Sequence, residues 1–485
     1  MTSELAAVRT PAMELSYEGS GWDNNGRLYR GADNNLYRII ASHADAFYRK
    51  AIENRELHAL VADGKLISFR TAEGIGDSGA LALQHESISI PTYPFEWTSE
   101  MFFRAAQLTL EICDRLLPHG MCLHDANFWN ILFRGRHPVF VDFTSIVPLT
   151  DAGFDAFVSE FRSGLLSSLD LIRDGHLTLL RRVSRDYGKS IVDDVAQHIV
   201  PRVPTGHSRL RKAGEEILMP ARTAARRVRR RLTTEFARRG SGARPAHYEQ
   251  LEALRKAIGA PIGPAATSWG GYYQGSNGLP PYDGSPQSLQ RALSSDGKHK
   301  VVADIIERVS PASYVDLGCN RGLYAHLASK LGATSVGIDI DEQSLDLMFR
   351  DGDRLNSQAL PCFADIVVPS APVGPAGKKW PTLAERCRGE LTSCLALAHH
   401  LLLGVPSVPT QFLVELLASY TSDWLIFEFV QPEDPFLREA YGAPPASYNL
   451  AHVLTQLERY FVVVERWPSS MMTRELIVCR RHAAH

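Results

Sequence analysis

A glycine-rich turn between an apolar run and a helical pattern carries the strongest chemical signal in this chain. The segment YVDLGCNRG (314–322) ends an apolar run typical of a buried strand. Gly318 and Gly322 would let the backbone approach a ligand without a Cβ in the way, and the helix that follows offers free N–H groups to its polar end. Asp339 ends the next apolar run, about twenty residues later, where a carboxylate suits two ribose hydroxyls. The pattern predicts a nucleoside-containing ligand.

The elements that must position these residues follow a regular alternation. From residue 300 onward, helical and strand-like patterns alternate as βαβ units require. The predicted strands after the first turn are the runs 335–341, 362–368, 393–398, 424–430, 460–465 and 475–480. The sequence therefore predicts an α/β, Rossmann-like domain with a mostly parallel sheet.

The motif lacks the full G-x-G-x-x-G of dinucleotide enzymes and resembles motif I of class I S-adenosylmethionine-dependent methyltransferases, D-x-G-x-x-x-G. The segments ADI (364–366), LALAHHLLL (395–403) and IFEFVQPEDP (426–435) resemble later motifs of the same superfamily, in the same order. The resemblance implies S-adenosylmethionine as cofactor. The residues that it implies for binding are Asp316, Gly318 and Gly322 at the methionine end, Asp339 at the ribose, Asp365 at the adenine, and Asn320 as a further candidate.

Candidates for catalysis follow the fourth and fifth predicted strands. His399 and His400 stand where a base could meet the acceptor, because a neutral imidazole can take a proton from a hydroxyl that attacks the methyl group. A packing role in the core is the alternative for each. Glu428 is a candidate base or a binder of a cationic substrate. The fourth run, LTSCLAL, lacks the acid that often stands there and no NPPY-type motif is present, which argues against N-methylation.

Aromatic residues precede the predicted Rossmann core. Trp269, Tyr272 and Tyr273 could form a lid over substrate or cofactor, or they could pack a connecting segment. The surrounding stretch 240–300 is rich in Gly, Pro, Ser and Tyr, which is typical of a linker or lid.

The N-terminal part carries a second constellation. Residues 122–145 (CLHDANFWNILFRGRHPVFVDFTS) resemble the catalytic loop of protein-kinase-like and aminoglycoside-phosphotransferase-like enzymes. The resemblance implies Asp125 as the base and Asn130 and Asp142 as ligands of Mg²⁺. No Gly-rich loop and no lysine-bearing strand accompany them, and Arg38 stands roughly where that lysine would be. We therefore expect a degenerate, kinase-like domain.

The order of these parts resembles a family of bacterial class I methyltransferases, some of them nodulation-type proteins, that carry a kinase-like segment first. The matching features are Asp125-Ala126 with Asn130, RGRHPVF at 134–140 and WGGYY at 269–273. The resemblance implies modification of a sugar, lipid or natural-product intermediate.

Length and patterning set the domain organisation. The 485 residues predict a mixed α+β, kinase-like domain at 1–204, an Arg-rich helical linker at 205–262 and a methyltransferase domain at 263–485. The basic run 209–239 could contact phosphates or acidic lipid, or simply present a solvated face. In the first domain, apolar spacing predicts a hairpin over 27–40, a helix over 43–61, another over 99–117 and helices over 154–199.

Composition narrows the class of partner. The net charge is −2, so no specific nucleic-acid partner is expected, and the seven scattered cysteines predict neither a metal site nor a disulfide framework. No apolar run is long enough to span a membrane and no signal peptide is evident, so we expect a cytoplasmic protein, with a homodimer as one candidate assembly.

The leading hypothesis is an enzyme that methylates a small molecule, most directly on oxygen. Two alternatives stay open. One is an Mg-ATP-dependent phosphotransferase, alone or combined with the methyltransferase. The other is a scaffold that binds S-adenosylmethionine, or an enzyme that uses it for a reaction other than methyl transfer.

Overall fold

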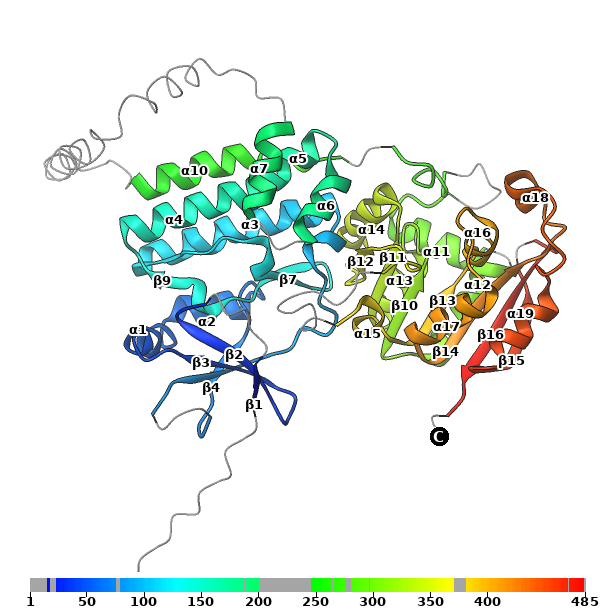
Figure 1. Cartoon of the computed structure of the whole chain (residues 1–485), viewed down its shortest axis with the longest axis horizontal. Helices are drawn as coiled ribbons and strands as arrows, with labels where there is room; N and C mark the ends of the chain where they lie inside the picture. The colour runs from blue at the N-terminus through cyan, green and yellow to red at the C-terminus, as the bar shows by residue number, and fades with distance from the viewer. Residues whose placement is uncertain are drawn as a thin grey trace, which may run out of the picture.

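A computed structural model shows two domains lying side by side (Figure 1). It describes residues 15–17, 23–75, 79–185, 189–199, 246–263, 266–274, 281–295, 297–369, 381–469 and 471–483. The basic run 209–239, and with it most of the predicted linker, lies outside the described residues. Within those residues, no helix is both long and apolar enough to cross a bilayer.

The C-terminal domain is built on a seven-stranded sheet with the order β12-β11-β10-β13-β14-β16-β15. Its strands are β10 (Ser313–Leu317), β11 (Thr334–Asp339), β12 (Leu360–Phe363), β13 (Gly389–Cys394), β14 (Thr421–Val430), β15 (Phe461–Pro468) and β16 (Arg474–Arg481). The first five are parallel, whereas β16 runs antiparallel to both β14 and β15. This arrangement confirms the predicted Rossmann-like domain.

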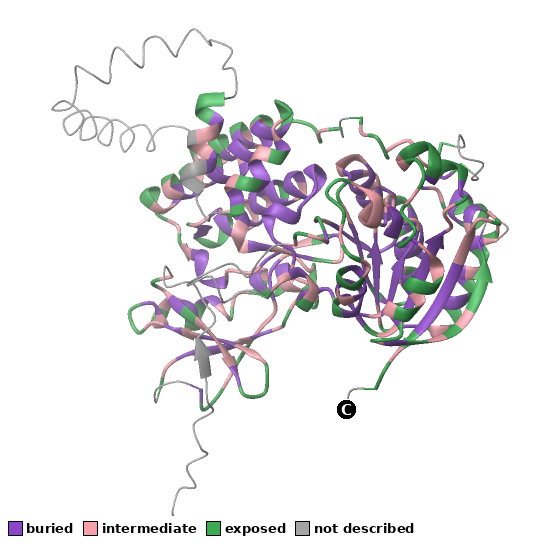
Figure 2. Ribbon diagram, turned by 45° about the vertical axis from the view of Figure 1, so that its right-hand side comes forward, coloured by how far each residue is buried: buried purple, intermediate pink, exposed green. Residues whose placement is uncertain are grey.

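Helices cover both faces of this sheet. They are α11 (Pro286–Ser294), α12 (Lys298–Val309), α13 (Leu323–Lys330), α14 (Glu342–Leu355), α15 (Leu383–Arg386), α16 (Ala398–Leu403), α17 (Thr410–Tyr420), α18 (Pro435–Tyr441) and α19 (Leu450–Leu457). Tyr314 and Val315, neighbours on β10, belong to separate hydrophobic clusters because successive side chains of a strand point to opposite faces. Figure 2 shows the resulting layer of buried strands between partly exposed helices.

Two of the predicted strand ranges are wrong by several residues. β12 ends at Phe363 rather than extending over 362–368, and β13 occupies 389–394 rather than 393–398. In both places the apolar run continues past the strand into the turn or helix at its carboxyl end. Periodicity cannot mark that boundary, because apolar residues stand on both sides of it.

The N-terminal domain begins with a five-stranded antiparallel sheet of order β1-β2-β3-β5-β4. These strands are β1 (Leu15–Tyr17), β2 (Gly26–Gly31), β3 (Leu36–Ile40), β4 (Phe69–Thr71) and β5 (Ala82–His85). Two small two-stranded antiparallel sheets follow, β6 (Met121–Leu123) with β9 (Ile146–Pro148) and the hairpin of β7 (Ile131–Arg134) with β8 (His137–Phe140). The predicted hairpin over 27–40 is confirmed as β2 and β3.

Helices make up the rest of this domain. They are α1 (Asp45–Ala51), α2 (Arg55–Ala62), α3 (Ser99–Leu116), α4 (Asp151–Phe161), α5 (Ser167–Arg173), α6 (Leu177–Arg185), α7 (Lys189–Ile199) and α10 (Ala246–Ile258), with a π-helical turn at Arg162–Leu166. The helix predicted over 43–61 is split into α1 and α2, because Asn54 is extended and its side chain accepts from the Glu56 N–H to start the second helix.

The helix α10 lies in the described part of the predicted linker and packs onto the first domain. Leu251 and Leu254 are fully buried in its hydrophobic cluster. Arg255 pairs with Asp114 of α3 at 2.7 Å. This part of the chain is therefore an element of the N-terminal helical layer.

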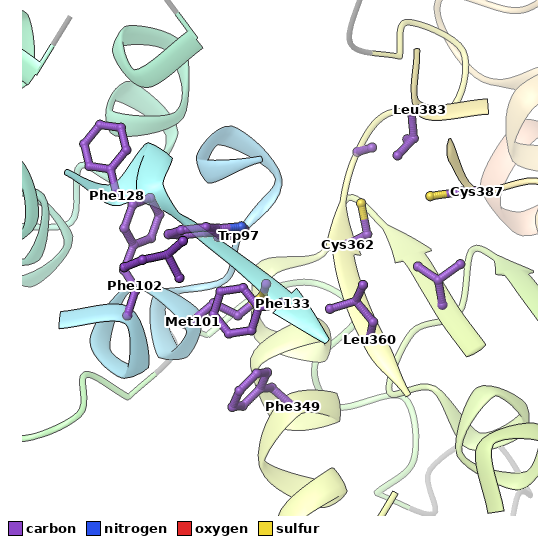
Figure 3. Close-up of a cluster of buried hydrophobic side chains, with 14 of the residues drawn as sticks. Trp97, Met101, Phe102, Phe128, Phe133, Phe349, Leu360, Cys362, Leu383 and Cys387 are labelled. Atoms are coloured by element: carbon purple, nitrogen blue, oxygen red, sulfur yellow. The ribbon is translucent and has the colours of Figure 1, made fainter. Parts of the chain in front are cut away.

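A hydrophobic cluster joins the two domains (Figure 3). Phe133 of β7 lies between Trp97 of the first domain and Phe349 of α14, with ring centroids 5.2 and 6.3 Å apart respectively. Polar contacts reinforce it: Asp346 of α14 accepts from the backbone N–H of Glu100 (3.1 Å) and from the hydroxyl of Ser99, in the first turn of α3. The N-terminus of α3 is thus capped by a carboxylate of the other domain.

Candidate functional site

The turn between β10 and α13 has the backbone geometry that its glycines predict. Gly318 and Gly322 have φ values near +71°, and Asn320 between them has φ +50°. A Cβ on Gly322 would lie 2.6 Å from the Met348 sulfur, and one on Gly318 would lie 3.1 Å from Leu397. The turn therefore needs glycine at both positions, for conformation and for space.

Asp339, at the end of β11, holds this turn. Its Oδ2 accepts from the Asn320 N–H (2.7 Å), and its Oδ1 accepts from the N–H groups of Ile340 and Asp341 (2.7 and 2.9 Å). Burial raises the pKa of Asp339, although these three donors counter the shift. With only one bond at Oδ2, that oxygen keeps a lone pair for a ligand donor.

Asp316, the one acidic residue of β10, is almost completely buried, with 2% of its surface exposed. The Ser393 hydroxyl donates to its Oδ1 (2.6 Å), and Tyr314 lies 2.6 Å from the same hydroxyl. Burial is the main cause that raises the pKa of Asp316 to about 7, with Ser393 and Lys298 acting in the opposite direction. A cation bound beside this buried carboxyl would stabilise its ionised form and lower its pKa.

Asp365 lies just beyond β12 and is exposed. One of its oxygens accepts from the Val367 N–H (2.9 Å), which orients the side chain. The Ala364 N–H donates to the carbonyl of Asp339 (2.9 Å), so the loops that follow β11 and β12 are tied together. Asp316, Asp339 and Asp365 thus stand at the carboxyl ends of three adjacent parallel strands.

The aromatic segment predicted as a lid lies against this edge of the sheet. The carbonyl of Trp269 accepts from the Asn320 side chain (3.1 Å), and Asp341 accepts from the hydroxyl of Thr267 (2.8 Å). Trp269 is 45% exposed, Tyr272 is half-buried and Tyr273 is buried. Only Trp269 and Tyr272 are therefore accessible to a ligand.

His399 and His400 begin α16, beside the same edge. Their rings are 4.0 Å apart, and the His400 ring also lies 5.3 Å from Trp269. His400 Nδ1 is 2.5 Å from the hydroxyl of Tyr441, whereas His399 Nδ1 is buried and has no hydrogen-bond partner among the described residues. Burial, followed by the influence of His400, lowers the pKa of His399 to about 3, so this ring is neutral at physiological pH.

Glu428 lies on β14 and is fully buried. Lys298 donates to one of its oxygens (2.7 Å) and the Ser469 hydroxyl to the other (2.6 Å). Burial alone would raise the pKa of Glu428, but Lys298, Ser469 and Arg474 together hold it below the ordinary value. The structure thus places Glu428 as a counter-ion, with both oxygens engaged.

Sequence reasoning missed several partners of these residues. Ser393 stands on the fourth strand, where the acid was found absent, and it bonds Asp316 instead. Tyr441 contacts His400 from a separate helix. A serine in place of the usual acid was visible in LTSCLAL, but nothing in the sequence around Tyr441 points to His400.

The three residues predicted from a resemblance to kinase-like enzymes, Asp125, Asn130 and Asp142, lie on neighbouring turns of the N-terminal domain. The side-chain amide of Asn130 donates to the carbonyl of Asp125 (3.1 Å). Arg38 of β3 lies 3.0 Å from Asp142 and 2.9 Å from Asp23. A cation of the protein itself therefore neutralises the carboxylate that was predicted to hold Mg²⁺.

Two further observations concern other parts of the described structure. No group of three or more His, Cys, Asp or Glu residues within it has the arrangement of a metal site. A cavity of about 830 Å³ lies between the domains, lined by Arg104, Gly135 and His137 on one side and by Thr334 and Gln358 on the other. This cavity lies at the amino-terminal ends of β11 and β12. Parallel sheets bind ligands at the carboxyl ends of their strands, so we place the candidate site at that edge, with the motif residues, and not in the cavity.

Comparison with known proteins extends over almost the whole chain. No protein-family model matches. Over 436 residues the chain is 27% identical to the nodulation protein NoeA of Rhizobium meliloti (strain 1021), which covers 87% of this chain and 86% of that protein. The expected resemblance to nodulation-type proteins is thereby confirmed.

Shorter similarities concern methyltransferases. A ribosomal protein L11 methyltransferase of Shewanella sp. (strain W3-18-1) is 34% identical over 92 residues, which cover 16% of this chain and 31% of that protein. Magnesium protoporphyrin IX methyltransferase of Synechocystis PCC 6803, solved with bound SAH, matches at 17% identity and a TM-score of 0.27, covering 44% of this chain and 97% of that one. The bifunctional kinase-methyltransferase WbdD matches at 18% identity and a TM-score of 0.28, covering 40% of this chain and 39% of that one. Both TM-scores lie below 0.5, so the fold assignment rests on the sheet topology itself.

Proposed function

We propose that this protein is an S-adenosylmethionine-dependent methyltransferase that methylates a hydroxyl group of a small molecule. The observation that carries the proposal is the row of carboxylates Asp316, Asp339 and Asp365 at the ends of adjacent parallel strands, above a turn that requires glycine. A crevice at the carboxyl ends of parallel strands is where α/β sheets bind nucleoside ligands.

The residues present fit S-adenosylmethionine end by end. The nearly buried Asp316 offers a carboxyl whose raised pKa is relieved by a cation such as the methionine ammonium group. Asp339 keeps a lone pair on Oδ2 for a ribose hydroxyl. The exposed Asp365, already oriented by Val367, can accept from the adenine amino group. When bound, S-adenosylmethionine supplies a methyl group activated by its positively charged sulfur.

On the acceptor side, His399 is the first candidate base. Its ring is neutral, and its buried Nδ1 lacks a partner among the described residues, which marks it as a group that awaits a ligand. When His399 takes a proton from an acceptor hydroxyl, Glu428 and Asp434 favour the imidazolium that forms, against the larger opposing effects of burial, His400 and Arg474. His400 is bonded to Tyr441 and so serves to orient the pair. Because Glu428 has both oxygens engaged, we no longer assign it as the base.

The acceptor class rests on the homology and on the walls of the site. The relative that matches most of the chain is a nodulation protein, which is compatible with the small-molecule acceptor proposed here, a sugar, lipid or natural-product intermediate. Trp269 and Tyr272 present aromatic surface beside the histidines, which suits a ring-containing small molecule. A cytoplasmic location and a homodimer stay predictions.

The phosphotransferase alternative is not favoured by the geometry. Arg38 lies within ion-pair distance of Asp142 and Asp23, and the hydroxyl of Thr144 bonds the same two carboxylates. We therefore propose that the kinase-like segment is a structural remnant without phosphotransfer activity.

A turnover experiment tests the proposed function. Purified protein is incubated with S-adenosylmethionine carrying a labelled methyl group and with extract fractions that contain sugars, glycolipids or small metabolites. We expect label in an acceptor and matching release of S-adenosylhomocysteine, both lost in Asp339→Ala and retained in Asp423→Ala, which removes an aspartate at the opposite end of β14. Equal turnover by Asp339→Ala, or label without S-adenosylhomocysteine, would contradict the proposal.

A further inference from the structure

One arginine of the N-terminal domain reaches the edge of the methyltransferase sheet. Arg181 of α6 is 5% exposed, and its guanidinium lies 3.5 Å from the centre of the Phe363 ring. It also forms an ion pair with Glu342 and donates to the carbonyl of Trp97 (2.9 Å). A planar guanidinium can stack on a ring and pair with a carboxylate at once, which a lysine ammonium cannot do equally well.

The two contacts of Arg181 in the methyltransferase domain belong to the loops that carry the candidate cofactor residues. Phe363 ends β12 and lies two residues before Asp365. Glu342 begins α14, three residues after Asp339. Because the Ala364 N–H donates to the Asp339 carbonyl, Arg181 supports both loops where they are joined.

The rest of the interface makes Arg181 a fixed support rather than a free side chain. Asp346, one turn further along α14, is buried and caps the first turn of α3. The ring of Phe349, on the same helix, packs against Phe133 of the N-terminal domain (Figure 3). The helix that follows the Asp339 loop is therefore held by the N-terminal domain along its length.

We propose that Arg181 is a positioning residue that holds the Asp339 and Asp365 loops in the arrangement needed for the adenine and ribose of the cofactor. The N-terminal domain thereby sets the cofactor affinity of the methyltransferase domain, without contacting the cofactor. The inference rests on the proposed function. It also gives the kinase-like domain a role that requires neither ATP nor a metal.

The chain offers a matched control at the other end of β12. Arg136, also buried, crosses the same interface, donates to the carbonyl of Ser357 (2.8 Å) and pairs with Asp353. Ser357 precedes β12, at the edge of the sheet away from the carboxylates. Replacing Arg136 perturbs the domain contact to a similar degree but leaves the cofactor edge untouched.

The test measures, by calorimetry, the binding of S-adenosylhomocysteine and of methylthioadenosine, which lacks the amino-acid end, to the full chain. We expect Arg181→Met to weaken both ligands roughly tenfold and Arg136→Met to change neither more than about twofold. Asp316→Asn should weaken S-adenosylhomocysteine alone. A general loss of stability would weaken binding alike in Arg181→Met and Arg136→Met. Displacement of the loops that hold adenine and ribose would instead weaken both ligands in Arg181→Met alone.

A second variant keeps the test valid if Arg181→Met fails to fold. Glu342, 30% exposed at its side chain, can be replaced by glutamine with little risk to folding, and Glu342→Gln should weaken both ligands in the same direction but less. Unchanged affinity in Arg181→Met and Glu342→Gln, or equal losses in Arg136→Met, would overturn the inference while leaving the proposed function intact. Absence of binding to the unmodified chain would instead defeat the proposed function.

Discussion

The buried carboxyl of Asp316 makes cofactor binding depend on pH in a calculable way. In the free protein, burial raises its pKa to about 7, so the carboxyl is largely protonated at pH 6. If the methionine ammonium group binds beside it, the ionised form is favoured and the pKa falls toward its ordinary range near 4. Binding at acidic pH must therefore release a proton.

The magnitude follows from the two protonation states. With a pKa of about 7 in the free protein, binding releases about 0.9 proton at pH 6 and about 0.2 at pH 7.5. The dissociation constant of S-adenosylhomocysteine should accordingly fall about eightfold between these two pH values. The sign is fixed: affinity rises with pH, because the carboxyl ionises as the pH passes the raised pKa.

Calorimetry in buffers of different ionisation enthalpy measures this proton release directly. Methylthioadenosine, which has no ammonium group, should release almost none, and Asp316→Asn should remove the pH dependence of S-adenosylhomocysteine binding. In the free protein the free energy of unfolding should fall as the pH rises from about 4 to about 7, because the pKa of this carboxyl is higher in the folded chain than in the unfolded chain. The variant should not show this fall. Proton release that is equal for the two ligands, or affinity that falls with rising pH, would refute this reasoning.

Three further predictions concern other parts of the chain. Lys298→Met should lower the free energy of unfolding by about 3–5 kcal/mol, because it leaves the buried carboxylate of Glu428 without the lysine that lies 2.7 Å away. Urea denaturation measures this change, and Glu428→Gln should lower the free energy of unfolding by less. His399→Gln should slow S-adenosylhomocysteine formation about 100-fold or more, while the variant's affinity for S-adenosylhomocysteine stays within about twofold of the unmodified protein's. A parallel loss of binding would argue against a catalytic role for His399. Millimolar Mg-ATP should leave the melting temperature unchanged, since Arg38 already neutralises Asp142, and a clear stabilisation would reopen the phosphotransferase alternative.

Local sequence predicted the cofactor turn well because its constraints are local. The two glycines at 318 and 322 and the aspartate at 339 belong to one strand–turn–helix–strand unit, so their spacing alone fixes their relation. The hairpin of β2 and β3 was predictable for the same reason. Strand ends were not, since the apolar runs 362–368 and 393–398 continue past the ends of their strands.

Long-range partnerships could not be predicted. The sequence offered Glu428 as a base or as a binder of a cationic substrate, but its partner is Lys298, which lies 130 residues away. Arg181 gives no sign in its own helix that it stacks on Phe363 of the other domain. Such pairs depend on how the sheet order and the domain interface bring distant segments together, which no periodicity records.

The measurement that tests the central claim most directly is a calorimetric titration of S-adenosylhomocysteine into the purified full chain and into Asp339→Ala. We predict binding at one site per chain, weakened roughly 10- to 150-fold in the variant because charged hydrogen bonds to the ribose and to the glycine turn are lost. Absence of binding to the unmodified chain, or the same affinity in Asp339→Ala, would contradict the assignment of this edge of the sheet as the cofactor site.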